Sequence, residues 1–268
     1  MGRLPAGFLP RVLYIIERYG RSLMRGAGIT LNIALAGTAV GCLIGFLLGL
    51  VRTIPLSKKD SLPKKALLRT IWAFIYCYVE LFRGTPMMVQ AMFIYYGAAY
   101  LFNIQMSRYR LFAGIFIVSI NTGAYMTETV RGGILSIDRG QTEGAMAIGM
   151  NHVQTMLRVI LPQALRNIMP QIGNNLIINI KDTCVLSTIS VVELFFASKS
   201  VAGALYLYFE TYAIVMFMYL VMTVFFSRVL RIAERKMDGP QSYQLVTVDQ
   251  LTPTSGLYRY PDKKQVDE

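Results

Sequence analysis

Charged residues are scarce in this chain of 268 residues: they make up 16% of it, whereas hydrophobic residues make up 54%. A soluble domain carries roughly 25% charged residues, so this chain has too few of them to cover a water-facing surface. The mean hydropathy of +0.45 agrees with this. The composition therefore argues against a small soluble enzyme and a disordered regulator, and it leaves the class of membrane proteins.

Cysteine and histidine are also scarce. Cys42, Cys77 and Cys184 lie in apolar stretches without the spacing of zinc ligands, so we expect neither a disulfide framework nor a zinc site. His152 is the only histidine, which is too little for a metal site or for an intramembrane enzyme with a nucleophile and a base. The phosphate-binding sequence G-x-x-x-x-G-K-[ST] is missing. We therefore predict a chain that is not an enzyme and binds no cofactor itself.

Long uncharged runs predict an all-α, multi-pass membrane protein with about five transmembrane helices. The 26 residues between Arg25 and Arg52 are all uncharged, and they would span ~39 Å as a helix, more than a hydrocarbon core needs. We interpret this run as a retained helix and not as a signal peptide, because it continues far beyond any cleavage site. The other predicted spans cover residues 67–102, 111–130, 164–195 and 205–230.

The second predicted span is interrupted at Gly84 and Pro86. Proline removes a backbone donor and disfavours helix at the residue before it, which is Thr85. The segment 67–102 is therefore either one broken helix or a short helix followed by a span. We favour a single crossing with its break at 84–86.

The lysines and arginines predict the orientation of the chain, with net charge +12. They flank the apolar runs and form no single stripe, which favours a membrane and not a nucleic acid as the partner. The connector 52–69 carries six of them, whereas the connectors near Arg108 and Lys199 carry two and one. Because basic loops stay in the cytoplasm, we place the loop 132–166 and the C-terminus inside and the N-terminus outside.

The arginines near the N-terminus oppose this orientation, so we expect residues 11–25 to lie on the membrane surface as an amphipathic helix. Beyond residue 236 the chain is polar. We therefore divide it into a basic amphipathic segment (1–21), a transmembrane domain (22–236) and a polar tail (237–268) that we expect to be disordered.

The segment 136–162 is too polar to span a membrane and predicts a compact knuckle of two short helices. Residues 141–148 are good helix formers apart from Gly144, and Gly149 suits the left-handed position that ends a helix.

The second helix of the knuckle has its own start signal. Asn151 and Gln154 predict a capping box, and we expect the helix to end at Pro162. The small residues between Gly144 and Gly149 leave room for close approach of another surface. An ordinary solvated loop is the alternative.

The knuckle resembles the EAA loop of ABC importer permeases. The family pattern is Glu-Ala-Ala, three residues, Gly, nine residues and Ile-x-Leu-Pro. Here Glu143-Gly144-Ala145 is followed at the same spacings by Gly149 and by Val159-Ile160-Leu161-Pro162. Gly144 and Val159 depart from the pattern and leave the spacing intact. Other segments within about 21–234 resemble the polar amino-acid subfamily: Glu80-Leu81-Phe82-Arg83-Gly84-Thr85-Pro86, 125–134, Arg139-Gly140-Gln141, Lys181-Asp182-Thr183 and Val192-Glu193-Leu194.

The resemblance implies a type I ABC importer fold and a permease subunit for a polar amino acid in a bacterial inner membrane. It implies that the loop docks on a separate ATP-binding subunit, which holds ATP and Mg. It also implies a second permease chain, identical or homologous, and an extracytoplasmic binding protein that delivers the substrate. The residues that it assigns to docking are Gln141, Glu143, Gly144, Ala145, Gly149 and Pro162.

Ionisable residues within the predicted spans are candidates for a function. Each costs about 2.5–3.5 kcal/mol on insertion scales and usually faces a cavity. Glu80 with Arg83, and Glu128 with Arg131, are spaced to pair along one helix face. Such pairs could equally hold helices together or bind lipid headgroups at the interface.

Lys181, Asp182 and Thr183 divide an otherwise apolar segment. A zwitterionic amino acid needs an acceptor for its ammonium group and donors for its carboxylate. Asp182 could be the acceptor, and Lys181, Asn179 and Thr183 could donate, with Ser187 further along the pathway. A gate or a helix-packing cluster without substrate contact is the alternative.

Two other functions are compatible with a multi-pass membrane protein. A secondary carrier driven by an ion gradient often has inverted repeats, and no repeated half is visible in this sequence. A membrane scaffold would not need the EAA-like spacing.

Overall fold

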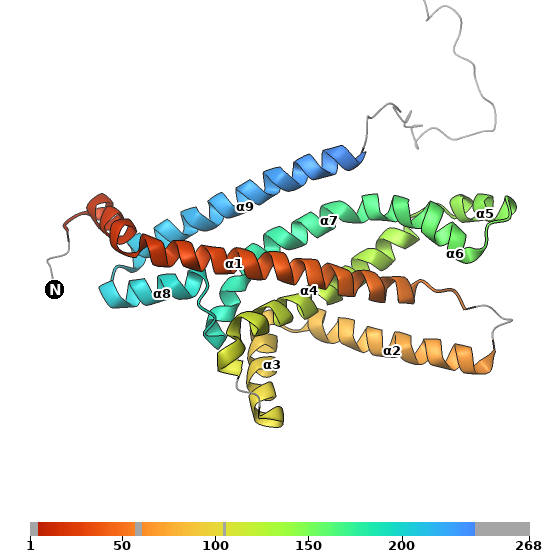
Figure 1. Ribbon diagram of the computed structural model, residues 1–268, viewed down its shortest axis with the longest axis horizontal. Coiled ribbons are helices and arrows are strands. Elements are labelled where there is room, and N and C mark those ends of the chain that lie inside the picture. Colours follow the sequence, from red (N-terminus) through yellow and green to blue (C-terminus); the bar gives the residue numbers. More distant parts are fainter. Residues whose placement is uncertain (1–4, 57–60, 104–105, 239–268) are drawn as a thin grey trace, which may run out of the picture. The chain divides into compact units, whose positions relative to one another are not determined.

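The computed structural model describes residues 5–56, 61–103 and 106–238, and among them it contains helices and no strand (Figure 1). The tail predicted to be disordered covers residues 237–268, of which 237 and 238 end a helix and 239–268 lie outside the described part. Residues Met1–Met237 form one compact unit. Its longer helices are α1 (Phe8–Arg52), α2 (Leu62–Gly84), α3 (Met87–Phe102), α4 (Arg110–Leu135), α7 (Leu161–Asp182), α8 (Leu194–Leu205) and α9 (Tyr208–Asp238). Its shorter elements are η1 (Met106–Tyr109), α5 (Arg139–Ala147), α6 (His152–Thr155), the π-helical turn η2 (Met156–Ile160) and the 3-10 helix η3 (Thr183–Ile189).

α1 and α4 form the most intimate helix pair of the unit. Four glycines at every fourth position of α1 each face one side chain of α4, also at every fourth position. Glycine lets two backbones approach closely, which in a membrane replaces the missing hydrophobic drive for association. The pairs are Gly37–Val118, Gly41–Thr122, Gly45–Met126 and Gly49–Val130. Because both residue numbers rise together, α1 and α4 run parallel.

Five long helices alternate in direction along the chain (Figure 1). α1 and α4 both run toward α5 and α6, whereas α2 and α7 run away from them. α9 starts beside the first turns of α1, where Glu210 forms an ion pair with Arg11, and Leu230 near its end lies against Gly173 of α7. Alternation is what consecutive crossings of one membrane require, so this order agrees with five spans.

By length and composition, two described helices suffice to cross a membrane, α1 and α9, and a third is added if the bent pair of His152–Ile189 and Leu194–Leu205 counts as one span. α2 and α4 are 23 and 26 residues long. Both carry charged residues, such as Glu80 and Glu128, which lower their hydropathy. A crossing by these two helices therefore depends on covering their polar side chains with neighbouring helices.

The break predicted at 84–86 is present. α2 ends at Gly84, Thr85 is extended (φ −123°, ψ 150°), and Pro86 precedes the first residue of α3. Extended backbone before proline is the expected steric result. α3 leaves α2 at a steep angle (Figure 1).

Helix α1 joins two segments that the sequence-based division separates. α1 is continuous for 45 residues and includes both the predicted surface segment and the first span. The proposed boundary between residues 21 and 22 therefore falls inside a helix.

The connector expected near Lys199 is helical, because residues Leu194–Leu205 form helix α8. Glu193 starts this helix by accepting hydrogen bonds from the backbone N–H groups of Phe195 and Phe196. The end of α7 was also misplaced: Asp182 ends it, a 3-10 helix follows to Ile189, and the chain bends by 56° before α8.

Candidate functional site

The knuckle has the predicted backbone geometry. α5 begins at Asp138, whose carboxylate accepts a hydrogen bond from the N–H of Gly140 at 2.6 Å. Gly149 ends the helix with φ +87°, a conformation that residues with a side chain rarely adopt. The N–H of Met150 then donates to the carbonyl of Ala145, which closes the C-terminal cap.

The capping box at the second helix is confirmed as well. The side chain of Asn151 accepts from the N–H of Gln154, and the side chain of Gln154 accepts from the N–H of Asn151. The two bonds fix the direction in which α6 leaves the turn at Gly149. The knuckle is therefore a rigid corner and not a solvated loop without structure.

The prediction that the second helix ends at Pro162 is wrong. α6 passes through the π-helical turn Met156–Ile160 directly into α7, where Pro162 lies in the first turn. Proline is tolerated in the first turn of a helix, because the N–H that it lacks would have no partner within that helix. The knuckle is thus joined to the long helix α7 without a break, and a movement of one must move the other.

The surface of the knuckle is unusually apolar for a segment outside the membrane. Ile148 is 76% exposed and Val153 is 63% exposed, and Met146 and Leu157 are also exposed. The predicted docking residues lie on this surface, except that Ala145 is buried and packs the knuckle internally. Gln141, Glu143, Gly144, Gly149 and Pro162 are all exposed. Exposed apolar residues gathered on a rigid corner are typical of a protein interaction site.

A second candidate site is a cavity of about 430 Å³ between the α2–α3 break, α4 and α7. It lies about halfway along the α1–α4 pair, since Thr122, the partner of Gly41, lines it. Its size suits a small ligand such as an amino acid. The residues that line it are Thr85, Pro86, Met87, Asn121, Thr122, Tyr125, Gln171, Asn175, Ile178, Asn179 and Asp182.

Asn179 lines this cavity, but its amide nitrogen is not free to donate to a ligand. It donates to the hydroxyl oxygens of Thr38 at 2.7 Å and Thr122 at 2.9 Å. Both of its N–H bonds are thereby used, and they join α1, α4 and α7 at one buried point. The predicted donor is therefore mainly a residue that holds three helices together.

Asp182 is the one acidic residue among those that line the cavity. It lies at the last turn of α7, and no described residue forms an ion pair with it. Lys181 next to it is exposed and does not line the cavity. Thr183 is buried and its hydroxyl donates to the carbonyl of Ile180, while Ser187 lies further along η3, outside the lining. Of the four predicted neighbours of Asp182, the structure brings only Asn179 to the cavity.

The α2–α3 break is held in the cavity wall by amide side chains that sequence reasoning did not connect. Gln90 donates to the carbonyls of Phe82 and Thr85, and it accepts from the side chain of Asn121 at 2.9 Å. The carbonyl groups that Pro86 leaves without helical partners are thus satisfied from α3 and α4. An amide four residues after a proline break was the available signal.

The predicted ion pairs have different outcomes. Glu128 pairs with Arg131 at 2.9 Å as the spacing indicated, and it pairs also with Arg52 from the end of α1. No described ion pair joins Glu80 and Arg83. The guanidinium of Arg83 lies instead 5.6 Å from the ring centroid of Tyr125, which lines the cavity.

Glu193 is a functional candidate that the sequence indicates only through the resemblance of Val192-Glu193-Leu194 to the polar amino-acid subfamily. Its side chain is fully buried, and besides capping α8 it accepts from the hydroxyls of Thr30 and Tyr219. One carboxylate therefore connects α1, α8 and α9. A glutamate directly before an apolar helical run was the available signal.

Comparison with known proteins identifies the architecture. Residues 66–239 match the family of the binding-protein-dependent transport system inner membrane component. The chain belongs to this family. It is therefore an inner membrane component of a transport system, and the knuckle, which resembles the permease EAA loop, lies within the matched residues.

Several curated relatives cover most of the permease chain. It is 36% identical to the glutamine transport system permease protein GlnP of Escherichia coli (strain K12), over 80% of this chain and 92% of that protein. It is 33% identical to a putative glutamine transport system permease protein of Rickettsia typhi, over 86% of this chain and 95% of that protein. A probable amino-acid permease protein of Bacillus subtilis, YxeN, is 34% identical over 82% of this chain and 92% of the relative.

Solved structures agree with the fold. A chain from the crystal structure of an amino acid ABC transporter with histidines has a TM-score of 0.72 and 32% identity, with 87% of this chain and 99% of that chain covered. A chain of the MetNI methionine ABC transporter has a TM-score of 0.67 at 19% identity, which supports the fold alone. The permease thus has the all-α fold of type I ABC importers.

Proposed function

We propose that this chain is the membrane-spanning subunit of an ATP-driven importer for a polar amino acid. A separate ATPase pair, which binds ATP and Mg, drives it, and an extracytoplasmic binding protein supplies the substrate. A second permease chain, identical or homologous, completes the pathway. This chain itself binds no cofactor and catalyses no reaction.

The observation that carries this proposal is the rigid, exposed knuckle. Its apolar side chains, including Ile148 and Val153, are left uncovered by the described part of this chain. Because α6 continues through η2 into α7, a push on the knuckle moves the helix that bears Asp182. A secondary carrier or a scaffold would have no use for such a corner, since neither receives force from an ATPase.

The charges around the cavity support the proposal of a zwitterionic substrate. Asp182 offers a carboxylate to the ammonium group of an amino acid in an otherwise uncharged lining. For the substrate carboxylate we propose Lys181 or Arg83, although neither lines the cavity itself: Lys181 is the exposed neighbour of Asp182, and Arg83 lies 5.6 Å from the ring centroid of Tyr125, which is a lining residue. The amide of Gln171 and the amide oxygen of Asn175 are suited to a polar substrate side chain, whereas the amide nitrogen of Asn175 already donates to the Met126 sulfur and to the Gln171 carbonyl.

The positions of the described basic residues support the proposal that the knuckle lies in the cytoplasm. Arg52, Arg69, Arg139 and Arg158 lie on the segments that meet at the knuckle end (Figure 1). Together with the five alternating helices, this supports the proposal that the N-terminus lies outside and the C-terminus inside. A reporter fused at residue 150 should then register the cytoplasm; a signal from the external face would contradict the orientation.

The decisive test is reconstitution of the permease with its ATPase and binding protein in lipid vesicles. We expect ATP hydrolysis to be stimulated by one or a few polar amino acids from a panel of twenty, and the same ones to accumulate in the vesicles. Uptake driven by an ion gradient without ATP would instead establish a secondary carrier. Failure of the ATPase to co-purify with the chain would refute the assigned role of the knuckle.

A further inference from the structure

α1 is much longer than a membrane requires. Its 45 residues correspond to a length of ~67 Å. The uncharged run 26–51 alone spans ~39 Å, which exceeds the ~30 Å hydrocarbon core. The preceding turns, from Phe8 to Arg25, therefore lie at or beyond the surface of the bilayer.

Three arginines line one side of these turns. Arg18, Arg21 and Arg25 follow each other at intervals of three and four residues, which places them within an arc of about 60° on a helix. All three are exposed, and none forms an ion pair with a described residue. Arg11, one of the other arginines of the segment, is by contrast paired with Glu210 at 3.0 Å.

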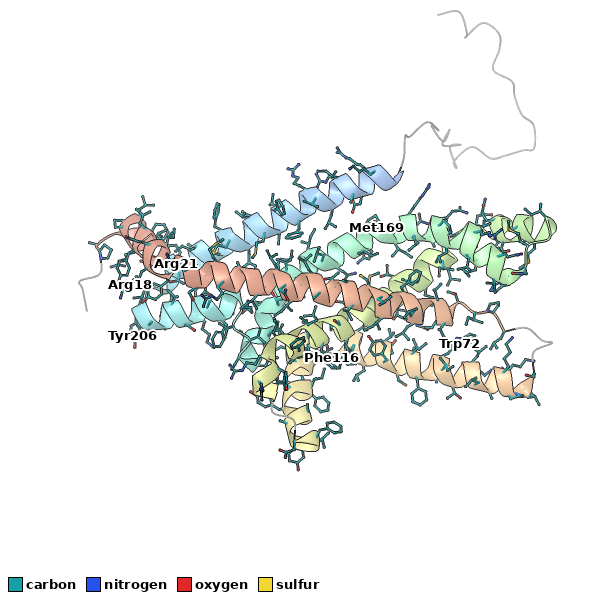
Figure 2. The ribbon with its side chains drawn as sticks, in the orientation of Figure 1. Arg18, Arg21, Trp72, Phe116, Met169 and Tyr206 are labelled. Atoms are coloured by element: carbon teal, nitrogen blue, oxygen red, sulfur yellow. The ribbon has the colours of Figure 1, made fainter. Side chains whose placement is uncertain are left out.

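Figure 2 shows Arg18 and Arg21 at the end of the molecule where Tyr206 follows α8. The acidic residue nearest to them in sequence is Glu17, which is exposed and forms no ion pair with a described residue. The three arginines, which we call the basic stripe, thus form no ion pair within the described chain.

The same turns also expose apolar side chains, on a different side from the basic stripe. Leu9 is 70% exposed and Leu13 is 66% exposed, and Ile16 continues this side of the helix. A third side, with Ile15 and Leu23, is buried against the rest of the unit. At about 100° per residue, the centre of this apolar arc lies about 150° from the centre of the basic stripe, so the two arcs point away from each other.

We infer that the basic stripe binds the phosphate groups of anionic phospholipids. Guanidinium groups bind phosphate through two parallel hydrogen bonds. The position of the stripe favours lipid over an acidic protein surface, because Arg25 directly precedes the uncharged run 26–51 and the stripe therefore lies at the level of the lipid headgroups. The inference does not depend on the transported substrate or on the ATPase.

Anionic lipid would also explain how arginines remain on the side of the membrane that basic residues usually avoid. Held by lipid phosphates, they are neutralised locally after insertion. Each basic residue near an anionic surface strengthens binding by about fivefold, so three together are expected to give a large lipid preference. The preference for anionic lipid should fall with added salt, because the length over which exposed charges interact shrinks to about 3 Å in 1 M salt.

A fluorophore at Ser22, between Arg21 and Arg25, reads the lipid composition beside the stripe. Ser22→Cys is made in a chain with Cys42, Cys77 and Cys184 replaced by serine, and the labelled full-length protein is placed in bilayers. The bilayers contain phosphatidylglycerol and phosphatidylcholine in equal amounts, and only one of the two is brominated in its acyl chains. We expect brominated phosphatidylglycerol to quench several-fold more strongly than brominated phosphatidylcholine.

Variants of the stripe decide the cause of such a difference. Arg18→Gln/Arg21→Gln/Arg25→Gln should abolish it, and the matched triple lysine variant should retain most of it; Arg21→Gln alone serves if the triple variant folds poorly. Equal quenching by both lipids in the parent chain, or a preference that survives the triple glutamine variant, overturns the inference. If the triple glutamine variant loses the stimulation of ATP hydrolysis by the binding protein while its lipid quenching is unchanged, the stripe is assigned to a protein partner instead.

Discussion

Gly45 of α1 lies directly against Met126 of α4: a Cβ atom built on Gly45 would come within 2.3 Å of the Met126 Cβ atom. Real Cβ atoms do not approach so closely, so glycine is required at this point. The same relationship recurs one helical turn later, where a Cβ on Gly49 would lie 2.7 Å from that of Val130. The parallel pair of α1 and α4 is therefore the frame against which the cavity-lining face of α4 is fixed.

Replacing Gly45 by leucine should destabilise the permease strongly. The leucine cannot be accommodated without separating the two backbones, and overpacking of a tight core costs about 1–3 kcal/mol or more. We expect a clear fall in the Tm of the detergent-solubilised protein. Unfolding is measured with a thiol-reactive dye that reports the exposure of Cys42 and Cys184. Gly28→Leu is the control, because no atom lies within 4 Å of a Cβ there. Equal Tm values for the two variants would contradict the packing argument.

Glu193→Ala should also lower stability, through loss of hydrogen bonds at a fully buried carboxylate. The cap of α8 is worth about 1 kcal/mol, and the hydroxyls of Thr30 and Tyr219 each lose their acceptor at a cost of about 1 kcal/mol or more. Tyr219→Phe removes one of these bonds and should have a smaller effect. Chemical denaturation of both variants measures the ranking; a Tyr219→Phe loss as large as that of Glu193→Ala would refute a shared role for the carboxylate.

Short-range patterns in the sequence were reliable where they depend on backbone chemistry. Gly149, the Asn151–Gln154 box and the break before Pro86 all act within one helical turn, so the local sequence determines them. Relations between distant residues could not be predicted in this way. The pairing of Arg52 with Glu128 joins residues 76 positions apart, and nothing in either segment indicates the other.

The same distinction explains the outcome at the candidate cavity. Asp182 was recognised because a charge in an apolar segment is conspicuous. Gln171 and Asn121 were not assigned to the site, because their convergence with Asp182 depends on how α4 and α7 pack. Asn179 was assigned as a donor, but Thr38 and Thr122 from two other helices use its N–H groups.

Asp182→Ala should abolish or strongly weaken transport while the complex still assembles. A charged hydrogen bond contributes about 1.5–3 kcal/mol, or roughly ten- to hundredfold in apparent affinity. Uptake by reconstituted vesicles at several substrate concentrations separates lost affinity from lost turnover. Asp182→Asn, which keeps the shape but not the charge, should resemble the alanine variant if the carboxylate binds an ammonium group. Uptake kinetics equal to those of the parent chain would remove Asp182 from the substrate site.

Gly149→Asp should separate insertion from coupling. The residue is exposed at φ +87°, and no atom lies within 4 Å of a Cβ built on it, so the variant meets backbone strain but no clash inside this chain. A charged side chain there would instead meet the docked ATPase. We therefore expect normal membrane abundance with loss of uptake and of ATPase association or coupling.

Gly149→Asn is the matched control for that variant, because asparagine tolerates a positive φ better than most residues and carries no charge. It should keep the turn, and any loss of uptake in it should be smaller than in Gly149→Asp. Membrane abundance, ATPase co-purification and amino-acid uptake are measured for both. Normal uptake by Gly149→Asp at normal abundance would defeat the role proposed for the knuckle, whereas equal loss in both variants would assign the defect to the size of the side chain and not to its charge. Reduced abundance of both would show that Gly149 is needed for folding, because then the turn itself, before any docking, has failed.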